Sequence, residues 1–230
     1  MRCARLHTWS LDVPRAKALQ TRLAARVEAV TPRSFKPRLI AGADMSHRRG
    51  SEWLYGAVVV LAWPGLEIVE TVTARRRASF PYVPGYLSFR EGPVLLDAFR
   101  KLKQRPDLVC CDGHGYAHPR RFGLACHLGL WLELPTLGVA KSRLVGTHAE
   151  PLQARGSTEP LFDGAERIGT VLRTRPNAHP LYVSVGHRIG LQAAADWALL
   201  LTRPEYRLPE PARQAHAAVN AYRKSIELDK

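Results

Sequence analysis

Two aspartates, Asp44 and Asp112, each close a short apolar run that is typical of a buried strand. Asp44 follows Leu39–Ala43, and Asp112 follows Leu108–Cys111. A strand that ends in an acid is typical of a site at the carboxyl edge of a sheet. Two carboxylates lie close together at such an edge only if a cation or a proton separates them. Because the chain carries a formal net charge of +14, we expect a divalent metal that grips a phosphate.

A third acid and a lysine could complete a hydrolytic site. Glu91 falls in the first turn of a helix expected from about Phe89, and Lys141 follows the strand expected over 136–139. Divalent cations held by carboxylates can activate water, neutralise charge and help a leaving oxygen, and an ammonium group can bind the scissile phosphate. Taken alone, Glu91 is equally explained as an acid at a helix N-terminus, and Lys141 as a solvated surface lysine.

The loop over 79–87 combines two prolines with aromatic residues that are held out of the regular elements. Pro81 and Pro84 stiffen it, and Tyr82 lies between them. A rigid loop bearing Tyr82 could wedge into a duplex and fill the gap left by an extruded base. The alternative is an ordinary proline-rich turn that packs its aromatic side chains on the core.

Basic and imidazole side chains offer weaker signals. Arg75–Arg77 precede the loop and would lie near a phosphate backbone if the loop is a wedge; otherwise they form a solvated edge. His118 and His216 could position water or bind metal, although a single histidine is more often structural. Further candidates for phosphate contacts are Arg120, Arg121, Arg143, Arg173 and Arg175.

The composition predicts an intracellular protein that binds nucleic acid. The 230 residues include 34 Lys and Arg against 20 Asp and Glu, an excess that suits nucleic acid or an anionic membrane surface. The longest apolar run, 57–63, is far too short to span a bilayer, and the N-terminal residues predict no secretory signal. The four cysteines show no CxxC spacing, which is typical of reduced, cytoplasmic thiols.

Hydrophobic periodicity predicts an alternation of strands and helices. Asp12 and Pro14 mark a helix start, and Leu95, Phe99 and Leu102 form the expected buried stripe of a later helix. We expect helices over about 14–30, 89–103, 121–132, 191–201 and 211–225, and strands over 39–45, 54–63, 67–73, 108–112, 136–139, 168–173 and 181–185. Only 156–159 reads as a loose loop.

This element order predicts an α/β fold of the ribonuclease H-like type. Three antiparallel strands are followed by parallel strands in a mixed central sheet flanked by helices, and 1–230 forms a single endonuclease domain. In that architecture the first and fourth strands lie side by side in the centre of the sheet. We therefore expect the carboxylates of Asp44 and Asp112 to converge.

The chain resembles the endonuclease V family. The resemblance is collinear over nearly the whole chain, and the motifs are specific only as a set. They are Ala41-Gly42-Ala43-Asp44-Met45-Ser46, Phe80-Pro81-Tyr82-Val83-Pro84-Gly85, Phe89-Arg90-Glu91-Gly92-Pro93, Asp112-Gly113-His114-Gly115, Ala117-His118-Pro119-Arg120, Pro135-Thr136-Leu137-Gly138-Val139-Ala140-Lys141-Ser142, Val183-Ser184-Val185-Gly186-His187 and Arg207-Leu208-Pro209-Glu210-Pro211.

The resemblance implies a Mg²⁺-dependent nuclease, with Mn²⁺ as a substitute, that acts on DNA containing deoxyinosine in DNA repair. It implies a nick at the second phosphodiester 3′ to the lesion, leaving 3′-hydroxyl and 5′-phosphate ends. Asp44, Glu91 and Asp112 would be metal ligands, His216 would lie near a second metal, and Lys141 would contact the phosphate. The wedge and the pocket for the flipped base would include Pro81, Tyr82, Val83, Pro84, Gly85, Leu87, Gly113, His118 and Leu124.

Two positions depart from the family pattern. Ala212 replaces the threonine common after Pro-Glu-Pro, so that hydroxyl is absent here. Tyr86 stands where smaller aliphatic residues are frequent, which bears on the shape of the wedge and of the pocket rim. At the position of His216, family members vary between histidine and an acid.

Two rival functions remain open on the sequence. An inosine-specific endoribonuclease of the same fold would differ in contacts to the 2′-hydroxyl, which the sequence does not reveal. A lesion-binding module without catalysis would use the basic surface and the wedge alone, and the intact set of acids argues against it. We expect a cytoplasmic monomer that binds no membrane.

Overall fold

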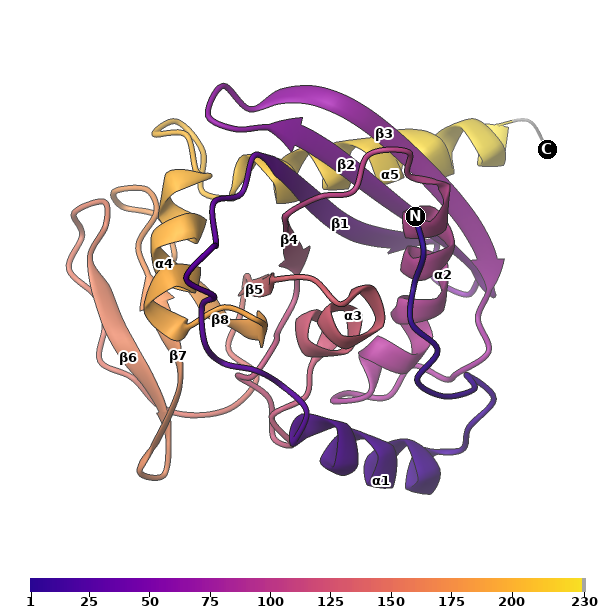
Figure 1. Ribbon diagram of the computed structural model, residues 1–230, viewed down its shortest axis with the longest axis horizontal. Helices are drawn as coiled ribbons and strands as arrows, with labels where there is room; N and C mark the ends of the chain where they lie inside the picture. The colour runs from indigo at the N-terminus through magenta and orange to yellow at the C-terminus, as the bar shows by residue number, and fades with distance from the viewer. Residues whose placement is uncertain (229–230) are drawn as a thin grey trace.

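The computed structural model describes residues 1–228, and its centre is one eight-stranded sheet (Figure 1). The strands are β1 (Leu39–His47), β2 (Trp53–Ala62), β3 (Glu67–Arg77), β4 (Leu108–Asp112), β5 (Thr136–Ala140), β6 (Thr158–Asp163), β7 (Glu166–Leu172) and β8 (Leu181–His187). Their order across the sheet is β3-β2-β1-β4-β5-β8-β7-β6.

The pairing of the strands confirms the ribonuclease H-like arrangement. β1, β2 and β3 form an antiparallel meander, and β4 and β5 run parallel to β1 beside it. The expected run of parallel strands ends there, because β8, β7 and β6 return to antiparallel pairing. β4 and β5 consist almost wholly of buried residues, as is typical of central parallel strands covered on both faces.

Five helices in the described part of the chain flank the sheet: α1 (Val13–Ala24), α2 (Leu87–Lys101), α3 (Leu124–Leu132), α4 (Leu191–Leu200) and α5 (Glu210–Leu228). α2 and α3 cover one face, whereas α4 and α5 cover the other (Figure 1). The adjacent Cys111 and Cys110 accordingly pack into opposite apolar clusters. Among the described residues, no helix is both long and apolar enough to cross a bilayer.

The first helix is shorter than the sequence predicts. Asp12 caps α1 by accepting a hydrogen bond from the amide of Arg15 at 2.8 Å, but the helix ends at Ala24 and not near residue 30. The next amides turn back to nearer carbonyls, and the amide of Glu28 donates to Nδ1 of His187 at 3.2 Å. A tertiary contact with His187 thus outweighs the helical spacing of apolar residues that continues to Val27.

Three other boundaries were wrong. The loose loop expected at 156–159 contains the start of β6, an edge strand whose Pro160 is tolerated there because edge positions need fewer donors. α3 begins at Leu124 rather than at Arg121, which adopts a left-handed backbone with φ of 53°. α2 begins at Leu87, so Glu91 lies in its second turn rather than its first.

A glycine brings α5 against the centre of the sheet. A Cβ atom at Gly42 of β1 would lie 1.8 Å from the carbonyl oxygen of Pro211, so only glycine allows this approach. Ala212, next in the chain, is enclosed in the apolar cluster on this face of the sheet. This close packing brings the following turns of α5 alongside Asp44.

Candidate active site

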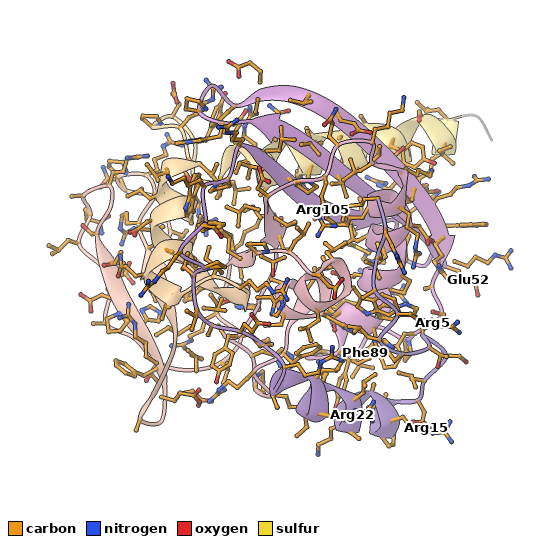
Figure 2. All side chains as sticks on the ribbon, in the orientation of Figure 1. Arg5, Arg15, Arg22, Glu52, Phe89 and Arg105 are labelled. Carbon is orange, nitrogen blue, oxygen red and sulfur yellow. The ribbon has the colours of Figure 1, made fainter. Side chains whose placement is uncertain are left out.

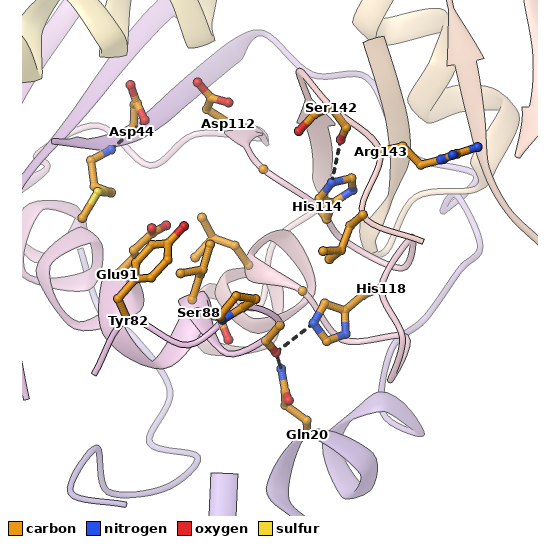
Figure 3. A pocket seen from close by; sticks show the side chains of 18 residues that line it. Gln20, Asp44, Tyr82, Ser88, Glu91, Asp112, His114, His118, Ser142 and Arg143 are labelled. Carbon is orange, nitrogen blue, oxygen red and sulfur yellow. Dashed lines mark hydrogen bonds between the residues drawn. The ribbon is translucent and has the colours of Figure 1, made fainter. Parts of the chain in front are cut away.

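The register between β1 and β4 brings two carboxylates together. Ala43 pairs with Cys111 in the parallel ladder, so the next residues, Asp44 and Asp112, lie side by side (Figure 3). Asp44 does not end its strand as expected, because β1 continues to His47 in pairing with β2 alone. The ladder to β4 stops at Ala43, which frees the space that both carboxylates face.

Each aspartate has a basic neighbour on one oxygen. Oδ2 of Asp44 lies 2.8 Å from Nδ1 of His216, while its Oδ1 accepts a hydrogen bond from the amide of Met45 at 2.8 Å. Oδ2 of Asp112 lies 2.5 Å from Nζ of Lys141, which directly follows β5. One ligand atom each from Asp44, Asp112 and His216 lies within 4.8 Å of the others.

Glu91 joins this group from the opposite side of the cavity (Figure 3). Burial, followed by the negative charges of Asp44 and Asp112, raises the pKa of Glu91 to about 8, against the charge of Arg90. Burial and then the charge of Asp112 also raise the pKa of Asp44, although hydrogen bonds from His216 and Met45 oppose the shift. The local carboxylates therefore exceed the positive charge that the protein itself provides.

This donor set fits a hard divalent cation. Mg²⁺ and Mn²⁺ prefer carboxylate oxygens, and an imidazole is acceptable to Mn²⁺. A cation bound among Asp44, Glu91 and Asp112 would remove the mutual repulsion that raises the pKa of two of them.

A cavity of about 410 Å³ opens beside the acids. It is within the size range of small-ligand pockets. Ten of the residues predicted for the site line it: Asp44, Tyr82, Pro84, Gly85, Leu87, Glu91, Asp112, Gly113, His118 and Leu124. The structure thus gathers residues from β1, α2, β4, α3 and two loops around one hollow.

Four predicted site residues lie outside the cavity wall. Lys141 and His216 contact the aspartates directly, as described above. Pro81 lines a neighbouring depression together with Tyr82. Val83 packs against a buried cluster that includes Phe80.

The proline-rich loop divides its aromatic side chains between core and solvent. Phe80 and Tyr86 are 1% and 9% exposed, so the core-packing alternative describes them correctly. Tyr82 is 63% exposed and reaches the mouth of the cavity near Glu91 (Figure 3). The position of Tyr82 therefore suits the wedge interpretation.

Three donors converge on one carbonyl of this loop. The oxygen of Gly85 accepts hydrogen bonds from Nη2 of Arg120 at 2.6 Å, Nε2 of His118 at 2.9 Å and Nε2 of Gln20 at 3.1 Å. Nδ1 of His118 accepts from the amide of Arg120, and burial lowers the pKa of His118 to about 4, so its imidazole is neutral. The guanidinium of Arg120 also lies 4.1 Å from the ring centroid of Tyr86. We call Gln20, His118 and Arg120 the carbonyl clamp.

Several predicted phosphate contacts are engaged inside the protein. Arg120 belongs to the carbonyl clamp, and Arg121 forms ion pairs with Asp163 and Glu166 at 2.9 and 2.8 Å. Arg173 is buried and ion-paired. The prediction was wrong for Arg173, because it is buried on protein acceptors. Arg120 and Arg121 are engaged with protein acceptors but only partly buried, so their contact with a phosphate backbone stays a prediction.

Other basic side chains remain exposed. Arg15 and Arg22 project outward from α1 (Figure 2). Arg75 and Arg77 lie over Trp53 at 5.1 and 5.3 Å from its ring, at the end of β3 that leads into the proline-rich loop. Contact of Arg75 and Arg77 with a phosphate backbone stays a prediction.

Sequence reasoning missed some of the cavity wall. Gln20 was not considered, although Ala16, Leu19 and Leu23 place it on the buried side of α1 by their helical spacing. A polar residue on an apolar face was the available signal. The other lining residues that the prediction left out are Met45, Ser88, His114, Gly123, Ser142 and Leu144, whereas Arg143, a predicted phosphate contact, does line the cavity.

Known proteins share both the sequence and the fold. An endonuclease V from Alkalilimnicola ehrlichii is 49% identical over 216 residues, which cover 94% of this chain and 95% of that protein. The crystal structure of endonuclease V from Streptomyces avermitilis has a TM-score of 0.88 at 41% identity, covering 95% of this chain and 96% of that one.

A variant endonuclease V from Ciona intestinalis has a TM-score of 0.79 at 25% identity, covering 93% of this chain and 98% of that one. That protein was crystallised with a 23mer DNA containing an inosine followed by a ribo-adenosine. The model of the family described as Endonuclease V matches residues 21–217, a range that contains every residue predicted for the site. On these grounds the chain belongs to the endonuclease V family of DNA-cleaving nucleases.

Proposed function

We propose that this protein is a metal-dependent endonuclease that recognises deoxyinosine in DNA and nicks the strand at the second phosphodiester 3′ to the lesion. The product ends would be a 3′-hydroxyl and a 5′-phosphate. The observation that carries the proposal is the convergence of Asp44, Asp112 and His216 within 4.8 Å, beside a cavity that Glu91 and Tyr82 also line. Membership of the family and the inosine-containing DNA bound by the Ciona protein support the choice of substrate.

Asp44, Glu91 and Asp112 are the proposed metal ligands, and His216 is the proposed further ligand at a second cation. Bound Mg²⁺, or Mn²⁺ in its place, would supply charge neutralisation at the phosphate and a more acidic water. Burial, followed by the charges of neighbouring carboxylates, raises the pKa of Glu91 and of Asp44, and a bound cation would offset both causes.

Lys141 is the proposed phosphate contact. Its ammonium group lies 2.5 Å from Asp112, so it already stands next to a ligand. The backbone carbonyl of Lys141 accepts a hydrogen bond from Nη2 of Arg207 at 3.0 Å, and Arg207 also binds the carbonyls of His179 and Pro180. This anchoring keeps the lysine at the edge of the cavity where a phosphate would enter.

The cavity is the proposed site for the flipped base. Tyr82 would fill the gap in the duplex, while Pro84, Gly85, Leu87 and His118 form one wall. The amide of Gly113 donates to the carbonyl of Val139 at 3.2 Å, so it is not free to read the base. The amide of Leu124 is better placed, because the first residue of a helix has no intrahelical acceptor.

The proposed setting is DNA repair in the cytoplasm, by a monomer. Exposed arginines such as Arg75 and Arg77 would bind the duplex on the side of the proline-rich loop. Phosphate contacts release counterions, so binding should weaken steeply as salt is added.

Paired nicking assays test the proposal. We expect the protein with Mg²⁺ to cut a DNA duplex that contains one deoxyinosine and to leave the matched undamaged duplex intact. A matched inosine-containing RNA tests the ribonuclease alternative, which deserves its own arm because the DNA bound by the Ciona protein carries a ribonucleotide after the inosine. Preference for RNA would favour that alternative, and binding without cutting of either would favour a non-catalytic module.

A further inference from the structure

A continuous chain of hydrogen bonds runs along the end of β1 and the middle and later turns of α5 toward Asp44. Nε of Arg223 lies 3.0 Å from Oγ of Ser46, which lies 2.9 Å from Oδ1 of Asn220. Nδ2 of Asn220 lies 3.1 Å from Nε2 of His216, whose Nδ1 lies 2.8 Å from Oδ2 of Asp44. We call Arg223, Ser46 and Asn220 the α5 relay.

The arginine fixes the first of these bonds. A guanidinium group only donates, so Oγ of Ser46 accepts from Arg223 and keeps its own proton available for Oδ1 of Asn220. Arg223 is itself held by Glu227, with Nη1 3.1 Å from the carboxylate.

A second, independent contact fixes the amide of Asn220 in the same sense. Nδ2 of Asn220 donates to the backbone carbonyl of His216 at 2.9 Å, an atom that can only accept. If the amide were turned over, its oxygen would face this carbonyl and its NH₂ group would face the proton of Ser46. The oxygen therefore points to Ser46, and the second amide proton points to Nε2 of His216.

The chemistry of imidazole completes the argument. A ring nitrogen that accepts a hydrogen bond carries no proton, so the other nitrogen of a neutral imidazole must carry it. Because Nε2 of His216 accepts from Asn220, the proton lies on Nδ1 and points at Oδ2 of Asp44.

We propose that Asn220, held by Ser46 and Arg223, is a positioning residue that locks His216 in the Nδ1-protonated form and so orients Asp44 for its cation. The orientation of Asp44 for a cation rests on the proposed function, whereas the tautomer of His216 does not. With His216 on Oδ2 and the amide of Met45 on Oδ1, the carboxylate of Asp44 is held at both oxygens. The opposite tautomer would place a lone pair of His216 against Oδ2 and remove one of these bonds. Because both ring nitrogens are engaged in this state, His216 would bind a second cation only after its Nε2 parts from Asn220.

The ring nitrogens of His216 report the tautomer directly. We expect ¹H–¹⁵N long-range correlation spectra of the metal-free protein, at a pH where His216 is neutral, to show a protonated Nδ1 and an unprotonated Nε2. In Asn220→Ala the Nε2-protonated form should appear. In Asn220→Asp the Nε2 nitrogen should carry a proton, because a carboxylate at this place accepts a hydrogen bond from it, while Nδ1 keeps its proton on Asp44. Ser46→Ala should give a smaller change in the same direction.

A matched control lies on the same helix. Ser225 is exposed, and its hydroxyl donates to the carbonyl of Tyr222, so Ser225→Ala removes a hydroxyl from α5 without touching the α5 relay. We expect its His216 spectrum to equal that of the wild type. A wild-type His216 protonated on Nε2, or an Nε2 that stays unprotonated in Asn220→Asp, would overturn the proposal.

Mn²⁺ binding tests the link from the tautomer to Asp44. In a calorimetric titration without DNA we expect Asn220→Ala to bind Mn²⁺ about tenfold more weakly than Ser225→Ala, a typical effect of a group that orients a metal ligand. A changed tautomer with unchanged affinity would refute the orienting role. If the wild type bound no Mn²⁺ at all, the proposed function would fail, and the tautomer would still be decided by the spectra.

Discussion

The two ends of the cavity are built on opposite principles. At one end Asp44, Glu91 and Asp112 crowd negative charge, and the pKa of Glu91 rises to about 8 through burial and the charges of its neighbours. At the other end the carbonyl of Gly85 is satisfied three times by the carbonyl clamp, whose donors come from α1 and from the turn before α3. The acidic end is electrostatically strained in the free protein, while the loop end is fully hydrogen-bonded.

The difference indicates a division of labour. Surplus negative charge favours a cation, so the acidic end should gain stability only when a metal binds. The loop end needs no ligand to hold its shape, which suits a support for the exposed Tyr82. Substitutions at the acidic end should therefore alter the nicking rate and metal binding. Substitutions at the loop end should alter the stability of the fold and the selectivity for the lesion.

The largest effect is expected at Asp112. In Asp112→Asn the nicking rate on deoxyinosine DNA with Mg²⁺ should fall more than about a thousandfold, equivalent to about 4 kcal/mol, because a proposed ligand is lost. Binding to the lesion duplex should persist in a gel-shift assay. The control is Asp196→Asn on α4, which should cut normally. The carboxylate of Asp196 accepts a hydrogen bond from Gln192 on the same helix. Normal cutting by Asp112→Asn would remove Asp112 from the site.

At the loop end, Gln20→Leu should lower the free energy of unfolding by about 2 kcal/mol. Gln20 is fully buried, and its loss leaves the carbonyl of Phe122 and the guanidinium of Arg120 with one partner fewer. Urea unfolding in EDTA measures the change, and the exposed Gln104 provides a matched control in Gln104→Leu. Equal stability of the two variants would show that the carbonyl clamp does not hold the loop.

The pH response of Glu91 separates the two ends further. A pKa raised from 4.5 to about 8 means that the folded protein keeps a proton that the unfolded chain releases between these values. Stability of the metal-free protein should therefore fall as pH rises from 5 to 8, by roughly 3–4 kcal/mol more than in Glu91→Gln. Urea unfolding in EDTA at both pH values measures this. Parallel pH profiles of the two proteins would mean that Glu91 is not strained.

The smallest stability effect is expected at Tyr82. Because its side chain is 63% exposed, Tyr82→Ala should change the free energy of unfolding by less than about 0.5 kcal/mol. The ratio of cutting rates on lesion and undamaged duplexes should nevertheless fall about tenfold, since stacking of an aromatic ring on a base contributes about 1–3 kcal/mol. Phe80→Ala should do the reverse, with a loss of stability first. An unchanged preference in Tyr82→Ala would exclude the wedge role.

The sequence predicted the acidic end better than the loop end. Asp44 and Asp112 were recognisable because each follows an apolar strand, and the element order placed those strands side by side. Lys141 followed from the same logic at the next strand. The sheet positions these residues, and a strand can be recognised from a short stretch of sequence by its pattern of apolar residues.

The loop end depends on contacts that no local pattern reveals. Gln20, Gly85 and Arg120 come from three distant segments, and their meeting depends on how α1 packs over the loop. The same limit explains why the internal partners of Arg120 and Arg121 were not foreseen. The α5 relay is similar, because Ser46 and Asn220 meet only through the packing of α5 on β1.

The most direct test is the position of a bound cation. A crystal of the protein soaked with Mn²⁺ should show an anomalous peak in direct contact with carboxylate oxygens from β1, α2 and β4, contributed by Asp44, Glu91 and Asp112. The peak should vanish in Asp112→Asn. An anomalous peak elsewhere on the protein, with the space between these three carboxylates empty, would contradict the account.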